Sequence, residues 1–214
     1  LYLTLSFLLV NIAFSLIRYE SLIIFLWHLL WSFISIFISV AGLIIITPLV
    51  ERKLNMATKQ ILLELLDFDS PLLKKMSKLI PGTYHHSLIV GNLAESAAEA
   101  VGANHLLARV GSYYHDIGKL ENPQFFIENN PNAEELHDKM MANESAKLIK
   151  RHLVNGVAMA KKNRLPKPVI EILEQHHGTS QIKYFLNKAH EAHLDIDPKE
   201  FYYDGPKAQT KEAA

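Results

Sequence analysis

The sequence predicts an all-α protein in two parts, an apolar helical hairpin followed by a bundle of helices. Residues 1–50 carry only Arg18, Glu20 and His28 as ionisable groups, whereas the remainder has the composition of a soluble domain. From Lys53 onward, hydrophobic residues recur with a helical period, and no alternating run of Val, Ile or Thr indicates a strand. There are 11 histidines, an abundance that suggests metal binding.

The apolar part predicts two transmembrane helices within residues 1–50. Residues 1–17 and 22–46 are almost wholly apolar, and a run of roughly 18 such residues can cross a bilayer as a helix. The short turn at residues 18–21 joins them into a hairpin. We expect the second helix to end at Thr47-Pro48. A buried hairpin of a soluble protein and a cleaved signal peptide are the less favoured alternatives.

Basic residues set the expected orientation in the cell membrane. Arg52, Lys53 and Lys59 follow the second apolar run directly, and an excess of Lys and Arg beside a span is typical of the cytoplasmic side. We therefore expect a multi-pass protein with its C-terminal domain in the cytoplasm. Because the chain begins with Leu1 inside an apolar run, we expect it to be a fragment, cut at both ends.

The charged part predicts linker helices over residues 51–81 and a separate domain over residues 82–214. Ser70-Pro71 is a favourable helix start, and Pro81-Gly82 is expected to break that helix. Further helices are expected at residues 86–101, 104–114, 143–163, 168–177 and 181–193. We expect loops or irregular chain at residues 121–134 and 195–209.

Composition excludes several classes of function. The chain has no cysteine, so it has no disulfide, thiolate metal site or thiol nucleophile. It has 22 basic and 22 acidic side chains, and this balance argues against a nucleic-acid polymer as partner.

Candidate metal ligands lie on separate predicted helices. They are His86, the His115-Asp116 pair, His152 and the His176-His177 pair. Five histidines and one aspartate exceed what a single ion with open positions needs, so two ions are the better interpretation. Asp116 has two oxygens and could bridge them. Two neighbouring ions activate water and neutralise phosphate oxygens, and Lys119 could add a cation at the phosphate.

The remaining histidines are weaker candidates for metal ligands. His85 is adjacent to His86 and faces a different direction, so only one of the two is expected to be a ligand. We do not expect His105, His137, His190 or His193 to be ligands. His137-Asp138 repeats the dipeptide but lacks the following Gly-Lys, and contact with substrate or metal is its less favoured interpretation.

Three motifs resemble those of the HD superfamily of metal-dependent phosphohydrolases. They are Gly82-Thr83-Tyr84-His85-His86-Ser87, His115-Asp116-Ile117-Gly118-Lys119 and His176-His177-Gly178-Thr179. The chain is more closely similar to the seven-transmembrane-receptor HD family, the membrane-bound cyclic di-AMP phosphodiesterases of bacteria. Further segments carry that similarity, namely residues 48–51, 70–75 and 203–207.

The resemblance implies an HD-type helical bundle and a binuclear manganese or iron site. It implies ligands at His86, His115, Asp116, His152, His176 and His177, with His86 favoured over His85. It also implies hydrolysis of cyclic di-AMP to pApA. The residues themselves make Asp116 and Lys119 the candidate catalytic residues, with Lys119 as the candidate substrate contact. The expected partners are therefore a cyclic dinucleotide and membrane lipid, with a homodimer as an option.

One ligand of the family is not matched. The family's site is completed by an aspartate on a helix after the Gly-Pro-Lys segment, whereas Asp195, Asp197 and Asp204 lie too early in this chain. We therefore expect a C-terminally incomplete HD domain and a fragment that is inactive or binds one ion poorly. The alternative functions are hydrolysis of another nucleotide, such as cyclic di-GMP or guanosine tetraphosphate, and nucleotide binding without turnover.

Overall fold

The computed structural model describes residues 2–18, 21–54 and 56–214, and these form two compact units divided after Leu54. Tyr19 and Glu20, in the predicted hairpin turn, lie outside the described residues. In the described residues every regular element is helical, and the one strand-like feature is an isolated bridge between Gln181 and Tyr202. The predicted all-α fold is confirmed.

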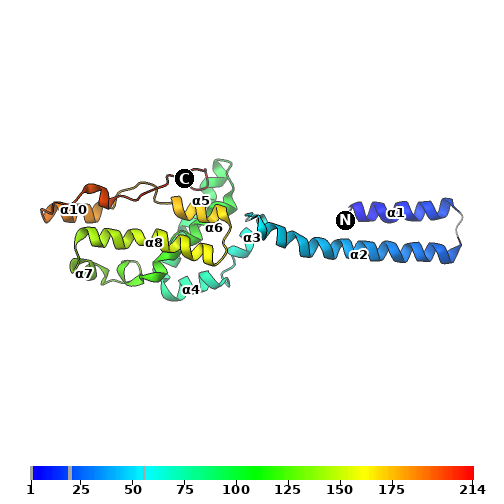
Figure 1. Cartoon of the computed structure of the whole chain (residues 1–214), viewed down its shortest axis with the longest axis horizontal. Coiled ribbons are helices and arrows are strands. Elements are labelled where there is room, and N and C mark those ends of the chain that lie inside the picture. The colour runs from blue at the N-terminus through cyan, green and yellow to red at the C-terminus, as the bar shows by residue number, and fades with distance from the viewer. Residues whose placement is uncertain (1, 19–20, 55) are drawn as a thin grey trace. The chain divides into compact units, whose positions relative to one another are not determined.

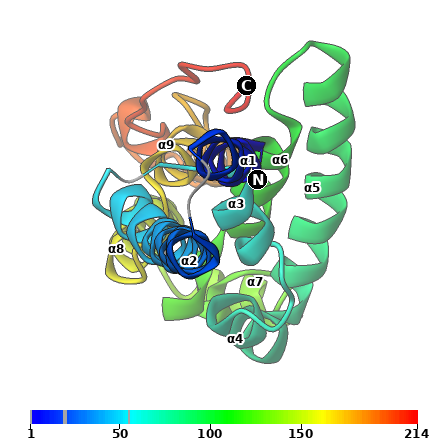
Figure 2. The ribbon, with the colours of Figure 1, turned by 90° about the vertical axis from the view of Figure 1, so that its right-hand side faces the viewer.

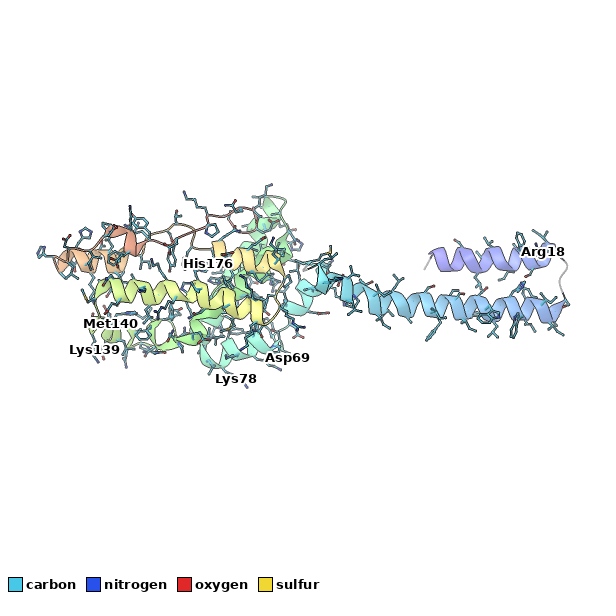
Figure 3. The ribbon with its side chains drawn as sticks, viewed as in Figure 1. Arg18, Asp69, Lys78, Lys139, Met140 and His176 are labelled. Carbon is cyan, nitrogen blue, oxygen red and sulfur yellow. The ribbon has the colours of Figure 1, made fainter. Side chains whose placement is uncertain are left out.

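The first unit consists of α1 (Tyr2–Ile17) and α2 (Leu22–Lys53), which contact each other and lie side by side in Figure 1. Among the described residues, the stretch Leu22–Glu51 of α2 is the one helix long and apolar enough to cross a membrane. Side chains project outward along α2 in Figure 3. Many of its apolar residues are exposed, for example Phe37 at 75%. This unit therefore presents an apolar surface that suits lipid.

The predicted end of the second helix at Thr47-Pro48 is wrong. Pro48 lies inside α2, which continues to Lys53. A proline within a helix removes one backbone hydrogen bond, yet long apolar helices accommodate it by local adjustment. The charged residues after position 50 thus belong to the same helix as the apolar run.

The second unit contains eight α-helices and three short 3-10 helices within the described residues. The α-helices are α3 (Lys59–Leu65), α4 (Pro71–Leu79), α5 (Pro81–Ala100), α6 (His105–Tyr114), α7 (Ala133–Asp138), α8 (Ala142–Lys162), α9 (Lys167–Gln175) and α10 (Lys183–Glu191). The 3-10 helices are η1 (Ile117–Glu121), η2 (Pro123–Phe125) and η3 (Pro198–Phe201).

Helix packing brings α5, α6, α8 and α9 around one core. α5 lies along α6 (Figure 2), α6 packs on α9, and α8 contacts both α9 and η1. Val110, Tyr114, Ile117, Val169 and Leu173 are fully buried where these elements meet. Because the same elements carry the candidate ligands, the core fixes the geometry of the site.

Two local predictions differ from the structure. The helix that begins at Pro71 ends at Leu79, just before Pro81-Gly82, as predicted. The next helix, however, begins at Pro81 and not at residue 86, because Pro81 suits the first turn of α5, where its missing N–H costs nothing. The predicted loop at residues 121–134 contains the last residue of η1, all of η2 and the start of α7. These are short pieces of helix, which periodicity over a long window does not detect.

Candidate metal centre

Helix ends place most of the candidate ligands. His115 caps the C-terminus of α6 and Asp116 follows it at the start of η1. His176 caps the C-terminus of α9 and His177 comes next, while His152 lies inside α8 and His86 inside α5. Four α-helices therefore converge with their imidazoles and one carboxylate.

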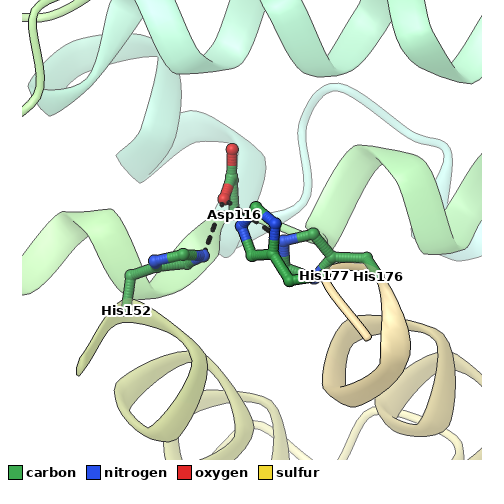
Figure 4. Close-up of side chains that lie close together, drawn as sticks. All are labelled: Asp116, His152, His176 and His177. Carbon is green, nitrogen blue, oxygen red and sulfur yellow. Dashed lines mark ion pairs between the residues drawn. The ribbon is translucent and has the colours of Figure 1, made fainter. Parts of the chain in front are cut away.

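The six predicted residues form two groups that share Asp116. One group is His86, His115 and Asp116; the other is Asp116, His152, His176 and His177. Within each group the potential ligand atoms lie within 4.8 Å of one another. Figure 4 shows the second group, in which His152, His176 and His177 surround the carboxylate.

The two oxygens of Asp116 face different groups. Oδ2 lies 3.0 Å from Nε2 of His115, whereas Oδ1 lies 3.3 Å from Nε2 of His152 and 3.8 Å from Nε2 of His176. A carboxylate so placed can give one oxygen to each of two neighbouring cations. Asp116 is 3% exposed, so few waters compete for it.

Backbone hydrogen bonds fix the orientation of three imidazoles. Nδ1 of His115, His152 and His176 lies 2.7, 2.6 and 2.7 Å from the carbonyl oxygen three residues earlier. A carbonyl can only accept, so Nδ1 carries a proton, and in the neutral imidazole Nε2 presents its lone pair toward Asp116. Holding one ring nitrogen so that the other is free is how proteins orient metal-binding histidines.

Unpaired buried atoms indicate that a cation fits this centre. Among the described residues, Oδ1 of Asp116 and Nε2 of His152 and His176 are buried and lack a hydrogen-bond partner. All three are electron-pair donors that face one another. Leaving such atoms unpaired is costly, and a divalent cation would satisfy all of them at once. The residues therefore fit the divalent metal that the family resemblance implies.

Electrostatics favour the ligating forms of His176, His177 and Asp116. Burial lowers the pKa of His176 to about 3 and that of His177 to about 4, so both are neutral at pH 7. Burial alone would raise the pKa of Asp116, but His115 and Lys119 outweigh it and hold that pKa well below its ordinary value. The carboxylate is therefore ionised.

The ammonium group of Lys119 lies between the carboxylates of Asp116 and Glu128. Its Nζ lies 2.9 Å from Oδ2 of Asp116 and 2.6 Å from Oε1 of Glu128. Burial alone would lower the pKa of Lys119, but the two carboxylates outweigh it and raise that pKa. The hydroxyl of Thr83 donates to the same Glu128 oxygen over 2.9 Å, which anchors the lysine to the start of α5.

Two residues at the centre were not predicted. Glu128 comes from an irregular segment, and its contact with Lys119 depends on tertiary packing. The ring of Tyr203 stacks on His177 with centroids 4.1 Å apart and an interplanar angle of 12°. Tyr203 lies in the 203–207 segment of the family resemblance, which was a usable signal, whereas Glu128 lies in none of the quoted motifs.

The other histidines lie outside both groups in the described structure. His105 pairs with Glu95 at 3.4 Å, and His85 is exposed. His137 is buried, and its Nε2 donates to the carbonyl of Phe125 over 3.0 Å. Neither group includes Asp195, Asp197 or Asp204.

Comparison with known proteins identifies the family. The HD domain family matches residues 83–213. The cyclic-di-AMP phosphodiesterase PgpH of Bacillus subtilis (strain 168) is 47% identical over 186 residues, covering 87% of this chain and 26% of the relative. PgpH of Listeria monocytogenes (strain 10403S) is 45% identical over 169 residues, covering 79% of this chain and 24% of the relative. The chain thus spans about a quarter of the length of these relatives.

Solved structures give the same result. The crystal structure of the L. monocytogenes PgpH HD domain matches with a TM-score of 0.61 and 46% identity over 68% of each chain. The same domain in complex with cyclic-di-AMP matches with a TM-score of 0.62 and 47% identity, again over 68% of each chain. The chain therefore belongs to the HD domain family and is a homologue of the PgpH phosphodiesterases, as its motifs predicted.

Proposed function

We propose that this chain is the HD region of a membrane-anchored phosphodiesterase that hydrolyses cyclic di-AMP to pApA. The observation that carries the proposal is the pair of donor groups sharing Asp116, because such a pair suits two adjacent cations at one phosphodiester. The similarity to two PgpH proteins supports the choice of cyclic di-AMP over other nucleotides.

In this proposal, His86, His115 and Asp116 would hold one divalent ion, and Asp116, His152, His176 and His177 would hold the other. The ions are manganese or iron, and when bound they supply an activated water and Lewis acidity toward the phosphate. The protein's own contribution is orientation and charge. Lys119, held by Glu128, keeps an ammonium at the carboxylate where phosphate oxygens would arrive.

We also propose the cellular arrangement. Residues 1–50 form a transmembrane hairpin in contact with lipid, residues 51–81 link it to the catalytic part, and residues 82–214 form the HD domain in the cytoplasm. Supporting this, α2 is long and apolar enough to span a bilayer, and Lys53 and Lys59 follow its apolar run. A homodimer is an option for its assembly, which mass photometry in detergent would test.

The test is hydrolysis by the intact protein, solubilised in detergent and loaded with Mn²⁺. We expect chromatography to show pApA from cyclic di-AMP and slower turnover of cyclic di-GMP. His115→Ala should lose bound metal, measured by mass spectrometry, together with activity. His105→Ala is the matched control, because His105 lies outside both donor groups.

The outcomes separate the alternatives. Faster cleavage of cyclic di-GMP would refute the assignment of the base. Metal and nucleotide binding without cleavage of any nucleotide would indicate a receptor rather than an enzyme. Full activity of His115→Ala would refute the ligand set.

A further inference from the structure

The two donor groups at the metal centre differ in the number and burial of their donors. We call His86, His115 and Asp116 the first group, and Asp116, His152, His176 and His177 the second group. His152 of the second group is 2% exposed, whereas His86 of the first group is exposed. A cation is held more tightly where more donors surround it and where burial strengthens each contact. The donors themselves therefore favour the second group.

The unpaired donor atoms at the centre also belong to the second group. Within the described residues these buried atoms are Oδ1 of Asp116 and Nε2 of His152 and His176. Oδ2 of Asp116 faces the first group, and it already has two partners: Nζ of Lys119 lies 2.9 Å away and Nε2 of His115 lies 3.0 Å away. An ion at the second group would satisfy unpaired atoms, whereas an ion at the first group would share a carboxylate oxygen with an ammonium.

The ammonium of Lys119 is held firmly at this oxygen. Besides Asp116, Oε1 of Glu128 lies 2.6 Å from Nζ, and Nζ lies 4.9 Å from the centroid of the Phe126 ring. The hydroxyl of Thr83 donates to the same Glu128 oxygen, so the carboxylate is fixed as well. The side chain of Lys119 is 14% exposed. The ammonium therefore stays beside the first group and is not free to move into water.

A cation at the first group and the ammonium of Lys119 carry charge of the same sign. Like charges a few ångströms apart repel strongly where little water screens them. Glu128 opposes this repulsion, because its carboxylate neutralises the ammonium and draws it away from Asp116.

We propose that Lys119 weakens binding of the ion at the first group, so that the centre binds its two ions in order, the second group first. Glu128 is then a positioning residue that acts through Lys119 and limits the weakening. The proposal rests on the two-ion ligand set of the proposed function. Because that function uses both ions, occupancy of the first group would set the fraction of active protein. Turnover would then follow the concentration of available metal.

The experiment measures Mn²⁺ binding to the intact protein in detergent, without substrate. Electron paramagnetic resonance of free Mn²⁺ gives the number of bound ions, and competition with a chelator gives the tighter Kd. We expect two ions whose Kd values differ at least roughly 10-fold, the lower end of the effect that residues around metal ligands have on affinity. His86→Ala should remove the weaker ion, and His176→Ala should weaken the tighter one.

Two variants test the lysine and its partner. Lys119→Met removes the ammonium and keeps a long side chain, and we expect it to tighten the weaker ion roughly 10- to 100-fold and the tighter ion by a smaller factor. Glu128→Gln keeps the shape but leaves the ammonium to Asp116 alone, so it should weaken the weaker ion further. In the Lys119→Met background, Glu128→Gln should lose most of this effect, because Glu128 acts through the ammonium.

Lys188→Met is the matched control. Lys188 also pairs with a carboxylate, that of Asp138 at 2.5 Å, and Asp138 lies outside both donor groups. Both Kd values of this variant should equal those of the wild type. Two ions of equal affinity in the wild type would overturn the proposal, as would an unchanged weaker Kd in Lys119→Met. If urea unfolding shows that Lys119→Met does not fold, Glu128→Gln decides, and an unchanged or tighter weaker ion in that variant overturns the proposal.

The binding measurement keeps this proposal separate from the proposed function, because it requires no turnover. If cyclic di-AMP is not cleaved but Lys119→Met tightens the weaker ion, the enzymatic assignment fails and the order of metal binding stands. If cyclic di-AMP is cleaved and two ions bind with equal affinity, the order fails and the function stands. A single bound ion in both the wild type and Lys119→Met would overturn the two-ion ligand set and this proposal with it.

Discussion

Gly118 lies where η1 meets α8, and replacing it with alanine should disrupt that contact. A Cβ at position 118 would lie 1.8 Å from the carbonyl oxygen of His152 and 2.5 Å from the backbone nitrogen of Gly156. Both atoms belong to the backbone of α8, so no side chain can rotate away. Overpacking in a core typically costs 1–3 kcal/mol, and we expect about 3 kcal/mol here because a helix must move.

The same displacement should weaken metal binding. α8 carries His152, whose Nε2 lies 3.3 Å from Asp116, and moving the helix separates the two. Gly156→Ala is the matched control, because its nearest neighbour is the flexible end of Leu173 at 3.1 Å. A helical Gly→Ala exchange gains up to about 1 kcal/mol, which offsets that contact. We expect Gly156→Ala to remain within about 1 kcal/mol of the wild type.

The assay is urea unfolding of the 214-residue chain in detergent, followed by far-ultraviolet circular dichroism. Trp27 and Trp31, the chain's 2 tryptophans, both lie in α2, so tryptophan fluorescence reports separately on the first unit. Competition with a chelator measures the affinity for Mn²⁺. If Gly118→Ala retained the wild-type stability and metal affinity, the close approach of η1 and α8 would be refuted.

Three further predictions concern the second unit. Tyr114→Phe removes the hydroxyl that donates to the carbonyl of Leu65 over 2.7 Å, and we expect a loss of about 1–3 kcal/mol in urea unfolding. Burial raises the pKa of Tyr114 to about 12, so its contribution to stability is complete below pH 10 and is lost between pH 10 and 12. That loss, up to about 2.7 kcal/mol, should be absent from Tyr114→Phe, and equal alkaline titrations of both proteins would contradict it. Leu173→Ala should cost about 2–5 kcal/mol because Leu173 is fully buried, whereas the exposed Leu79→Ala should change the unfolding free energy by less than about 0.5 kcal/mol. Mn²⁺ at 100 times its Kd should stabilise the second unit by about 2.7 kcal/mol in the wild type and not in His152→Ala, as thermal unfolding would measure.

Composition and periodicity were sufficient to predict an all-helical chain with an apolar part followed by a charged part. The change in charge near residue 50 lies close to the division into two compact units after Leu54. The long helices α5, α6 and α8 were likewise predicted, because each has enough turns to show a helical period. Local signals of this kind accumulate along the chain and need no knowledge of tertiary contacts.

The candidate ligands were predicted only in part from the residues themselves. Spacing placed His115, Asp116, His176 and His177 at helix ends, but it did not show that these ends converge. The family resemblance supplied that, and the structure brings the residues together. The backbone contacts of Nδ1 in His152 and His176, which orient the lone pairs, follow from rotamers that the sequence does not specify.

Gly82 illustrates why the remaining contacts of the site could not be predicted from the sequence. A glycine after a proline predicts a turn, yet Gly82 lies within the first turn of α5. A Cβ there would lie 1.7 Å from the carbonyl oxygen of Glu128, so glycine is required for a close approach between distant segments. That approach lets Thr83 bond Glu128, and Glu128 in turn holds Lys119 beside Asp116. A missing side chain has the same appearance in a sequence whether it permits a turn or a contact, and only the packed structure separates the two.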